Sequence, residues 1–302
     1  MKKKLLKALV ANVDGEIFAL DGYAATGDGG ATPVPLTLSN TRNMPFGSEL
    51  MYLPQRRPVL LNLQSGRIET VNENPYAPGQ ALYPVTAFNS PGYVLSHLGT
   101  FVETPEAQAL PLFSYGAVGW HRGKFRSAVI RVDREKRQDL RLMKPEDVAV
   151  GIDRMRQQMR ANRLRAHLEK CALQYGCPAA KNFFLSRYEA PIPTAQHCNA
   201  RCLGCLSLQK HSEIPRSQDR IGFTPSPEEI AEVALAHIKR VKNSVVSFGQ
   251  GCEGDPLLAA DVIAAAIRLI RSETKRGTIN MNTNASRPAI LERLFASGLD
   301  SL

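Results

Sequence analysis

Cysteine is scarce in this sequence, and long apolar runs are missing from it. Six of the 302 residues are cysteine, and no apolar stretch reaches the roughly 20 residues of a membrane-spanning helix. The basic start is not followed by a small-residue cleavage site, which argues against a secretory signal peptide. We therefore expect a cytoplasmic protein without a membrane partner. In that compartment, clustered cysteines are more often metal ligands or catalysts than disulfide partners.

Acidic residues are outnumbered by basic ones. The net charge is +10, and residues 120–170 hold 15 lysines and arginines against 7 aspartates and glutamates. Such a segment attracts nucleic acid or another anionic substrate, or it is the solvated arginine face of a helix. No nucleic-acid-binding signature accompanies the basic residues, so both interpretations stay open.

With 43% apolar residues, the chain can bury a substantial core. Its local composition and hydrophobic pattern divide it into three parts. Residues 1–143 carry 11 of the 20 prolines and several short β-like runs. Asp14-Gly15 and Ser65-Gly66 each lie between apolar runs, which indicates β-hairpins. We expect a β-rich domain here, whose ligand the sequence does not indicate.

Residues 144–190 are expected to form a basic helical connector. Pro145 suits the first turn of a helix, and apolar residues follow it at spacings of three or four. A second helical segment runs from about Leu164 to Gly176, with Cys171 at its end and Cys177 just beyond. These two thiols are either incidental buried residues or ligands of a second metal centre.

Residues 191–302 alternate between strand-like and helix-like segments. Ser226, Pro227 and Glu229 form a capping-box pattern that predicts the start of a helix. Strand patterns at 244–249 and 278–286 alternate with helix patterns at 261–273 and 289–298. This order favours a parallel sheet or a barrel, in which functional residues gather beyond the carboxyl ends of the strands.

Half of the cysteines lie in the short stretch QHCNARCLGCLS. Cys198, Cys202 and Cys205 have the spacing Cys-x3-Cys-x2-Cys, and three thiolates so close in sequence can converge on one metal centre. A structural zinc ion would need a fourth protein ligand. His197 is a poor candidate because it adjoins Cys198. An iron–sulfur cluster with one open iron needs only these three.

On this spacing, the segment from about Pro191 resembles the first half of a radical S-adenosylmethionine (SAM) enzyme core. The resemblance implies a [4Fe-4S] cluster held by the three cysteines, with the methionine moiety of SAM on the fourth iron. It also implies reductive cleavage of SAM to a 5′-deoxyadenosyl radical that abstracts hydrogen from a substrate. An external electron donor of the flavodoxin or ferredoxin type would be required.

Two further stretches resemble motifs of this family. FGQGCEGDPLL follows the second strand and resembles Gly-Gly-Glu-Pro, with Gly254, Asp255 and Pro256 aligned and Glu253 as an alternative carboxylate for the SAM ammonium group. MNTNAS resembles Thr-Asn-Gly, which implies that Thr283 and Asn284 lie near SAM.

Three positions depart from the family pattern. Gly204 replaces an aromatic residue before the third cysteine, Asp255 replaces glutamate, and Ala285 replaces glycine. These departures indicate a distinct subfamily. Cys252, inside the glycine-rich stretch, is a hydrogen-atom donor, a group acceptor or a ligand of an extra metal, or it is simply a small residue that fits the turn.

The predicted fold class is therefore α/β, with a β-rich N-terminal domain followed by the first βα units of a partial (βα)6 radical SAM barrel. Because six units need roughly 190 residues, we expect the chain to be the N-terminal part of a longer protein. The predicted function is that of a radical SAM enzyme with an unknown, anionic or macromolecular substrate. The alternative is a zinc-binding module with a basic nucleic-acid-binding region.

Overall fold

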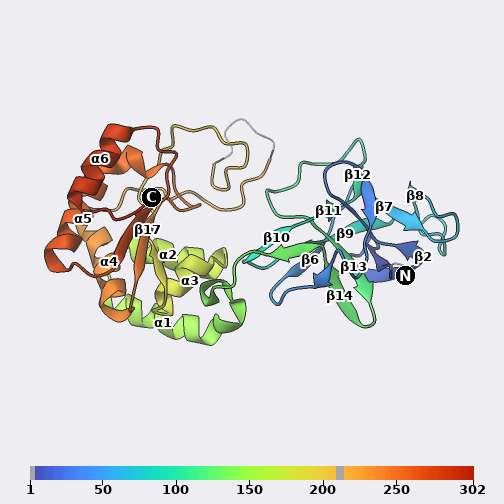
Figure 1. The fold of residues 1–302 in the computed structure, drawn as a ribbon, viewed down its shortest axis with the longest axis horizontal. Helices are drawn as coiled ribbons and strands as arrows, with labels where there is room; N and C mark the ends of the chain where they lie inside the picture. The colour runs from blue at the N-terminus through green and yellow to red at the C-terminus, as the bar shows by residue number, and fades with distance from the viewer. Residues whose placement is uncertain (1–3, 209–213) are drawn as a thin grey trace. The chain divides into compact units, whose positions relative to one another are not determined.

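The computed structural model describes residues 4–208 and 214–302, which divide into two compact units, Met1–Arg141 and Leu142–Leu302 (Figure 1). Each unit is described by itself. Across the described ranges, no helix has both the length and the apolar character needed to cross a bilayer.

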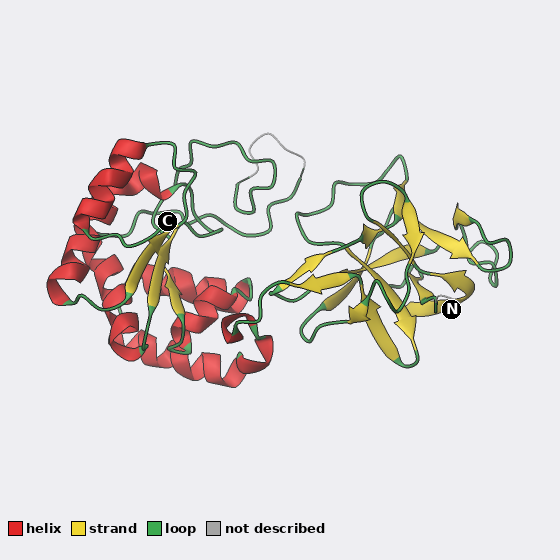
Figure 2. Ribbon diagram, in the orientation of Figure 1, coloured by secondary structure: helices red, strands yellow, loops and turns green. Residues whose placement is uncertain are grey.

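The regular elements of the first unit are nearly all strands, shown in yellow in Figure 2, and green loops connect them. They are β1 (Lys7–Ala11), β2 (Ile17–Ala24), β3 (Thr26–Asp28), β4 (Pro33–Pro35), β5 (Arg42–Asn43), β6 (Glu49–Tyr52), β7 (Arg56–Asn62), β8 (Ile68–Thr70), β9 (Tyr83–Phe88), β10 (Tyr93–Leu95), β11 (Leu98–Gly99), β12 (Phe101–Glu103), β13 (Gly116–His121), β14 (Lys124–Ser127) and β15 (Val129–Arg131). Two short 3-10 helices follow, η1 (Lys136–Gln138) and η2 (Leu140–Leu142).

Thirteen of these strands form one sheet, whose main path is β12-β7-β2-β1-β9-β13-β11-β3-β4, and β10 pairs with β15 separately. The two predicted hairpins are confirmed, because β1 pairs antiparallel with β2 and β7 pairs antiparallel with β8. Gly15 (φ 81°) and Gly66 (φ 70°) supply the left-handed conformation that these turns require.

The second unit contains α1 (Pro145–Gln158), α2 (Arg163–Gln174), α3 (Pro178–Phe184), β16 (Glu189–Pro191), α4 (Pro227–Arg240), β17 (Val245–Phe248), η3 (Pro256–Ala259), α5 (Ala260–Glu273), β18 (Thr278–Met281) and α6 (Pro288–Ser297). The three strands form a parallel sheet in the order β16-β17-β18. Their register pairs Ala190 with Val246 and Val246 with Ile279.

Local signals in the sequence set the helix ends. At the start of α4 the predicted capping box is confirmed: the Ser226 hydroxyl accepts from the Glu229 amide at 3.3 Å, and Glu229 accepts from the Ser226 amide at 2.8 Å. Gly298, in the left-handed conformation with φ 110°, ends α6 as predicted.

The start of α2 is joined to the start of α4. Asn162 caps α2 by accepting from the Arg165 amide at 2.9 Å, and it donates to the Glu229 carbonyl at 2.9 Å. Arg163 makes an ion pair of 2.7 Å with the Glu229 carboxylate, the same group that closes the capping box. A polar link therefore joins the N-termini of two helices that share the core of the second unit.

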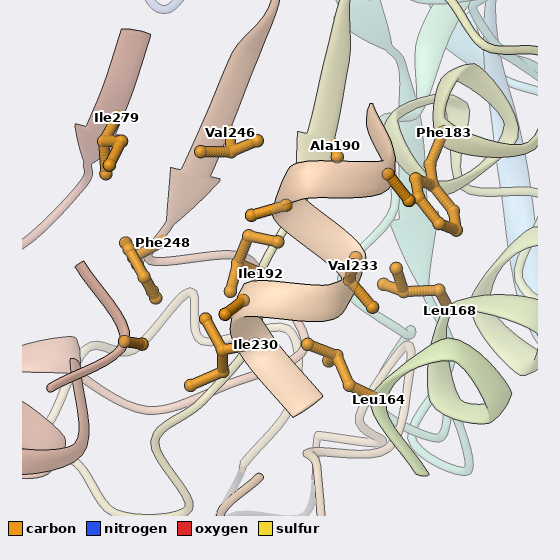
Figure 3. Packing of buried hydrophobic residues seen from close by; sticks show 14 of the residues in the cluster. Leu164, Leu168, Phe183, Ala190, Ile192, Ile230, Val233, Val246, Phe248 and Ile279 are labelled. Atoms are coloured by element: carbon orange, nitrogen blue, oxygen red, sulfur yellow. The ribbon is translucent and has the colours of Figure 1, made fainter. Parts of the chain in front are cut away.

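One hydrophobic core runs through the second unit from Val148 to Leu299. Figure 3 shows Leu164 and Leu168 of α2 beside Val233 of α4, with the sheet residues on the other side of that helix. Segment 144–190 thus shares a buried core with the chain that follows it.

The predicted fold class is wrong. We expected an α/β protein in which a β-rich domain precedes the first units of a (βα)6 barrel. Across the described residues the strands instead pair mostly antiparallel, and the parallel ones form an open sheet of three. Barrel geometry needs a longer series of tilted and staggered strands, which an order of elements along the sequence does not provide.

Candidate functional site

Three loops follow the carboxyl ends of β16, β17 and β18, which lie at one edge of the parallel sheet. The first loop contains the cysteine motif, the second is the glycine-rich stretch, and the third is the Thr-Asn stretch. The sequence motifs therefore occupy neighbouring loops, and hydrogen bonds between these loops define the site.

Asp255 joins the second loop to the third. Its buried carboxylate accepts a hydrogen bond from the Thr283 hydroxyl at 2.9 Å and one from the Asn284 amide at 2.8 Å. The same carboxylate accepts from the Leu257 amide at 3.0 Å, which caps η3. Asp255 thus holds Thr283 and Asn284 in place and has few lone pairs left for a ligand.

Glu253 joins the first loop to the second. One carboxylate oxygen accepts from the amides of Thr194 and Ala195 at 2.8 and 2.9 Å, and the other accepts from those of Gly249 and Gln250 at 2.7 and 2.8 Å. Burial raises the pKa of Glu253 to about 7, against the effect of these amides. Since both oxygens are occupied, Glu253 is a support of the loops rather than a ligand group.

Two glycines allow the loops to approach each other closely. The Gly254 amide donates to the Ala195 carbonyl at 2.6 Å, and a Cβ at Gly254 would lie 1.9 Å from the His197 carbonyl oxygen. Gly249 has φ 80°, and a Cβ there would lie 1.8 Å from the Asn282 carbonyl oxygen. Larger residues at either position would push the loops apart.

The first loop also contacts the third directly. The Asn284 side-chain amide donates to the Asn199 side chain at 2.8 Å, and Asn199 donates to the Ser286 hydroxyl at 2.8 Å. Residue 199 directly follows the first cysteine of the motif. The start of the cysteine loop is therefore anchored beside the Thr-Asn stretch.

The three cysteines of the motif are not joined in disulfides, with Cys198 and Cys205 half-buried and Cys202 exposed. The Ala200 amide donates to Cys198 Sγ at 3.4 Å, and Arg220 Nη2 donates to Cys205 Sγ at 3.4 Å. Burial raises the pKa of Cys205, but the following backbone amides and Arg220 together hold it below its ordinary value.

The three cysteines of the loop do not form one compact donor group in this structure. Ligand atoms around one tetrahedral zinc lie about 3.5 to 4 Å apart. Among the described residues, one group of His, Cys, Asp or Glu has its ligand atoms within 4.8 Å of one another, and it does not contain the three loop cysteines. In this conformation the three thiols are therefore not arranged around a single metal ion.

The compact group consists of His167, Cys171 and Cys252. The pKa of Cys171 lies well below its ordinary value, mainly because the Cys252 thiol forms a hydrogen bond with it. Burial opposes this shift, and His167 lowers the pKa further. The hydrogen bond with Cys171 raises the pKa of Cys252. Burial raises the pKa of the neighbouring Cys177.

The structure thus brings together the three loops that contain the predicted site residues. Within these loops, the predicted residues differ in how deeply they are buried. Gly254 is half-buried and precedes η3, whose first residue is the buried Pro256. Thr283 is half-buried and Asn284 is exposed, and both donate to Asp255. Sequence reasoning missed His167 and Arg220. The spacing His167-x3-Cys171 on a predicted helix could have indicated His167 as a metal ligand. No local sequence pattern indicated that Arg220 contacts a cysteine of the motif.

Comparison with known proteins adds no relative. Scans of protein-family models, characterised proteins and solved structures gave no match to this chain.

Proposed function

We propose that this chain carries the cluster- and SAM-binding loops of a radical SAM enzyme. The observation that supports the proposal best is the convergence of three motif-bearing loops, tied by Glu253, by Asp255 and by the Asn199–Asn284 hydrogen bond. Each of the three loops resembles a different motif of the family. Hydrogen bonds join these loops at one edge of the parallel sheet.

In this proposal Cys198, Cys202 and Cys205 hold a [4Fe-4S] cluster. The cluster and SAM, when bound, would supply reductive cleavage of a carbon–sulfur bond and a 5′-deoxyadenosyl radical for hydrogen abstraction. The exposure of Cys202 leaves that side of the loop accessible to an external electron donor of the flavodoxin or ferredoxin type.

The chain's own residues hold the binding surface in shape. Asp255 fixes Thr283 and Asn284, which in this proposal lie beside the methionine moiety of SAM. Glu253 does not take the ammonium group in this proposal, because its four acceptor positions are occupied by backbone amides. Gly254 and Pro256 let the second loop lie against the first.

We place the protein in the cytoplasm in the same proposal. The six cysteines form no disulfide, although Cys171 and Cys252 are close neighbours. A reducing compartment keeps such thiols reduced and suits an oxygen-sensitive cluster. The substrate class stays open between anionic small molecules and macromolecules.

The test is anaerobic reconstitution of the chain with iron and sulfide, followed by incubation with SAM and dithionite. We expect a brown protein with about four irons per chain, as the cluster's composition requires, and release of 5′-deoxyadenosine. Cys202→Ala should lose the iron and the product. Cys177→Ser, which removes a thiol outside the loop, should keep both.

A colourless chain that takes up no iron would contradict the proposal, and so would iron uptake that Cys202→Ala leaves unchanged. Arg220→Lys tests whether the positive charge near Cys205 is enough to keep the iron, because Lys retains the charge but loses the guanidinium geometry. That variant should keep its iron.

A further inference from the structure

A second donor group lies in the second unit, apart from the cysteine loop. His167 and Cys171 lie one turn apart on α2, so that their side chains project from the same face of the helix. Cys252 comes from the loop after β17. The three ligand atoms lie within 4.8 Å of one another.

The distances within this group match those of a tetrahedral zinc site. His167 Nε2 and Cys171 Sγ are 3.5 Å apart. With Zn–S near 2.3 Å and Zn–N near 2.0 Å, tetrahedral geometry places two such ligand atoms about 3.5 Å apart. No large backbone movement is therefore needed to bring a zinc ion between the two side chains.

The surroundings of the group also suit a metal. Cys171 and Cys252 are almost fully buried, with 2% and 7% of their surfaces exposed, whereas the imidazole of His167 is half-buried and reachable from solvent. Two thiolates and one imidazole form a donor set that prefers zinc among the common divalent ions.

We propose that His167, Cys171 and Cys252 form a zinc site with three protein ligands. Binding displaces the thiol protons to solvent and leaves the fourth tetrahedral position to water. The site ties α2 to the loop that contains Glu253 and Asp255, and so stabilises the loop that supports the candidate functional site. It is independent of the cluster proposed for the cysteine loop.

Cys177 serves as the matched control. Its amide donates to the Cys171 carbonyl at 3.0 Å, so it lies close by, but its Sγ does not belong to the compact group. Removing this thiol takes away a neighbouring cysteine without removing a proposed ligand.

The experiment uses the full chain with Cys198, Cys202 and Cys205 replaced by alanine, which removes every loop thiol. This parent is loaded with zinc or cobalt(II), dialysed and measured by elemental analysis. We expect one zinc per chain and, with cobalt, the strong thiolate-to-cobalt absorption of a tetrahedral site. Adding Cys252→Ser or His167→Gln should reduce the retained zinc at least tenfold, whereas adding Cys177→Ser should leave it unchanged.

Cys171 and Cys252 pack in the core, so replacing either could also destabilise the fold. Zinc retention and the melting temperature are therefore also measured in a variant that keeps both cysteines. His167→Gln changes a half-buried residue that is not part of that core, and zinc should raise the melting temperature of the parent but not of this variant. A parent that retains no zinc would overturn the proposal. So would equal zinc loss in Cys177→Ser, or a Cys171–Cys252 disulfide in the protein purified under reducing conditions.

These outcomes are separate from those that test the proposed enzyme function. Iron uptake and SAM cleavage report on the cysteine loop, which the parent variant lacks. Zinc retention reports on α2 and the loop after β17. Either proposal can therefore fail while the other stands.

Discussion

The Asp255 carboxylate accepts a hydrogen bond of 2.9 Å from the Thr283 hydroxyl, 28 positions further along the chain. Through this bond the loop after β17 holds the loop after β18. The contact lies between the two loops that the proposed function assigns to SAM.

Asp255→Asn should destabilise the second unit. The amide nitrogen that replaces one oxygen faces hydroxyl or N–H donors, so at least one buried donor loses its acceptor, at a cost of about 1–3 kcal/mol. Urea denaturation measures the free energy of unfolding. The exposed carboxylate of Asp261 gives the control, because Asp261→Asn removes only a surface ion pair with Arg293 and should change that free energy by less than about 1 kcal/mol. Equal losses in the two variants would refute the role of Asp255.

Gly254→Ala should separate the first two loops. A Cβ would lie 1.9 Å from a backbone carbonyl oxygen, which has no flexible end that can move away. We expect a loss of stability of more than about 2 kcal/mol and faster amide hydrogen exchange in the loop after β17. Gly204→Ala is the control, since nothing lies within 4 Å of its added Cβ. If Gly254→Ala changed neither stability nor hydrogen exchange, the loops would not be packed as described.

Glu253→Gln should lower stability more than a surface change does. The new amide group would point a donor at two backbone N–H groups that now share one oxygen, which leaves buried donors without acceptors. We expect a loss of about 1–3 kcal/mol or more. Glu273→Gln, at the exposed end of α5, should be neutral. Thermal melting of both variants provides the comparison.

His237 should make the second unit sensitive to acid. Burial lowers the pKa of this histidine to about 4, and the neighbouring charge of Arg240 acts in the same direction, while the contact of Nε2 with the Tyr188 carbonyl at 3.2 Å opposes them. A lowered folded-state pKa means that the stabilising contribution is complete above the ordinary value of 6.5 and is lost as the pH falls toward 4.

The corresponding measurement is the free energy of unfolding of the second unit between pH 7 and pH 4, the range that brackets the ordinary and the lowered value. His237→Phe should flatten the part of the decline that this group causes, because phenylalanine fills the site and does not titrate. The ring would still pack against Phe183, whose ring centre lies 6.2 Å away. An unchanged slope in the variant would assign the acid sensitivity to other groups. His121→Gln, in the first unit, should not alter the slope.

Local structure was predictable because its causes are local. A glycine that adopts positive φ made the turn at Gly15 recognisable, and a serine followed by proline and glutamate made the start of α4 recognisable. The sheet of the first unit was not predictable in this way. β1 pairs with β13, whose residues lie more than a hundred positions away, and no short pattern encodes that partner.

The sequence predicted which loops follow the parallel strands, but not the contacts that their residues make. Glu253 and Asp255 are both acids in a glycine-rich stretch, and the sequence does not tell which loops each of them joins. The three-dimensional fold decides this, because Glu253 faces donors from two loops while Asp255 faces Thr283 and Asn284. Arg220 reaches Cys205 across 15 positions of loop, a contact that no spacing rule predicts.

The link between the starts of α2 and α4 has a practical consequence for shortening the protein. A chain cut to begin at Pro191 would lose Asn162 and Arg163, the polar partners of Glu229, together with the α2 side chains that cover α4. Such a piece would expose apolar surface and aggregate. The shortest piece that can be produced for biophysical work on the three loops therefore starts before Pro145, at the boundary that follows Arg141.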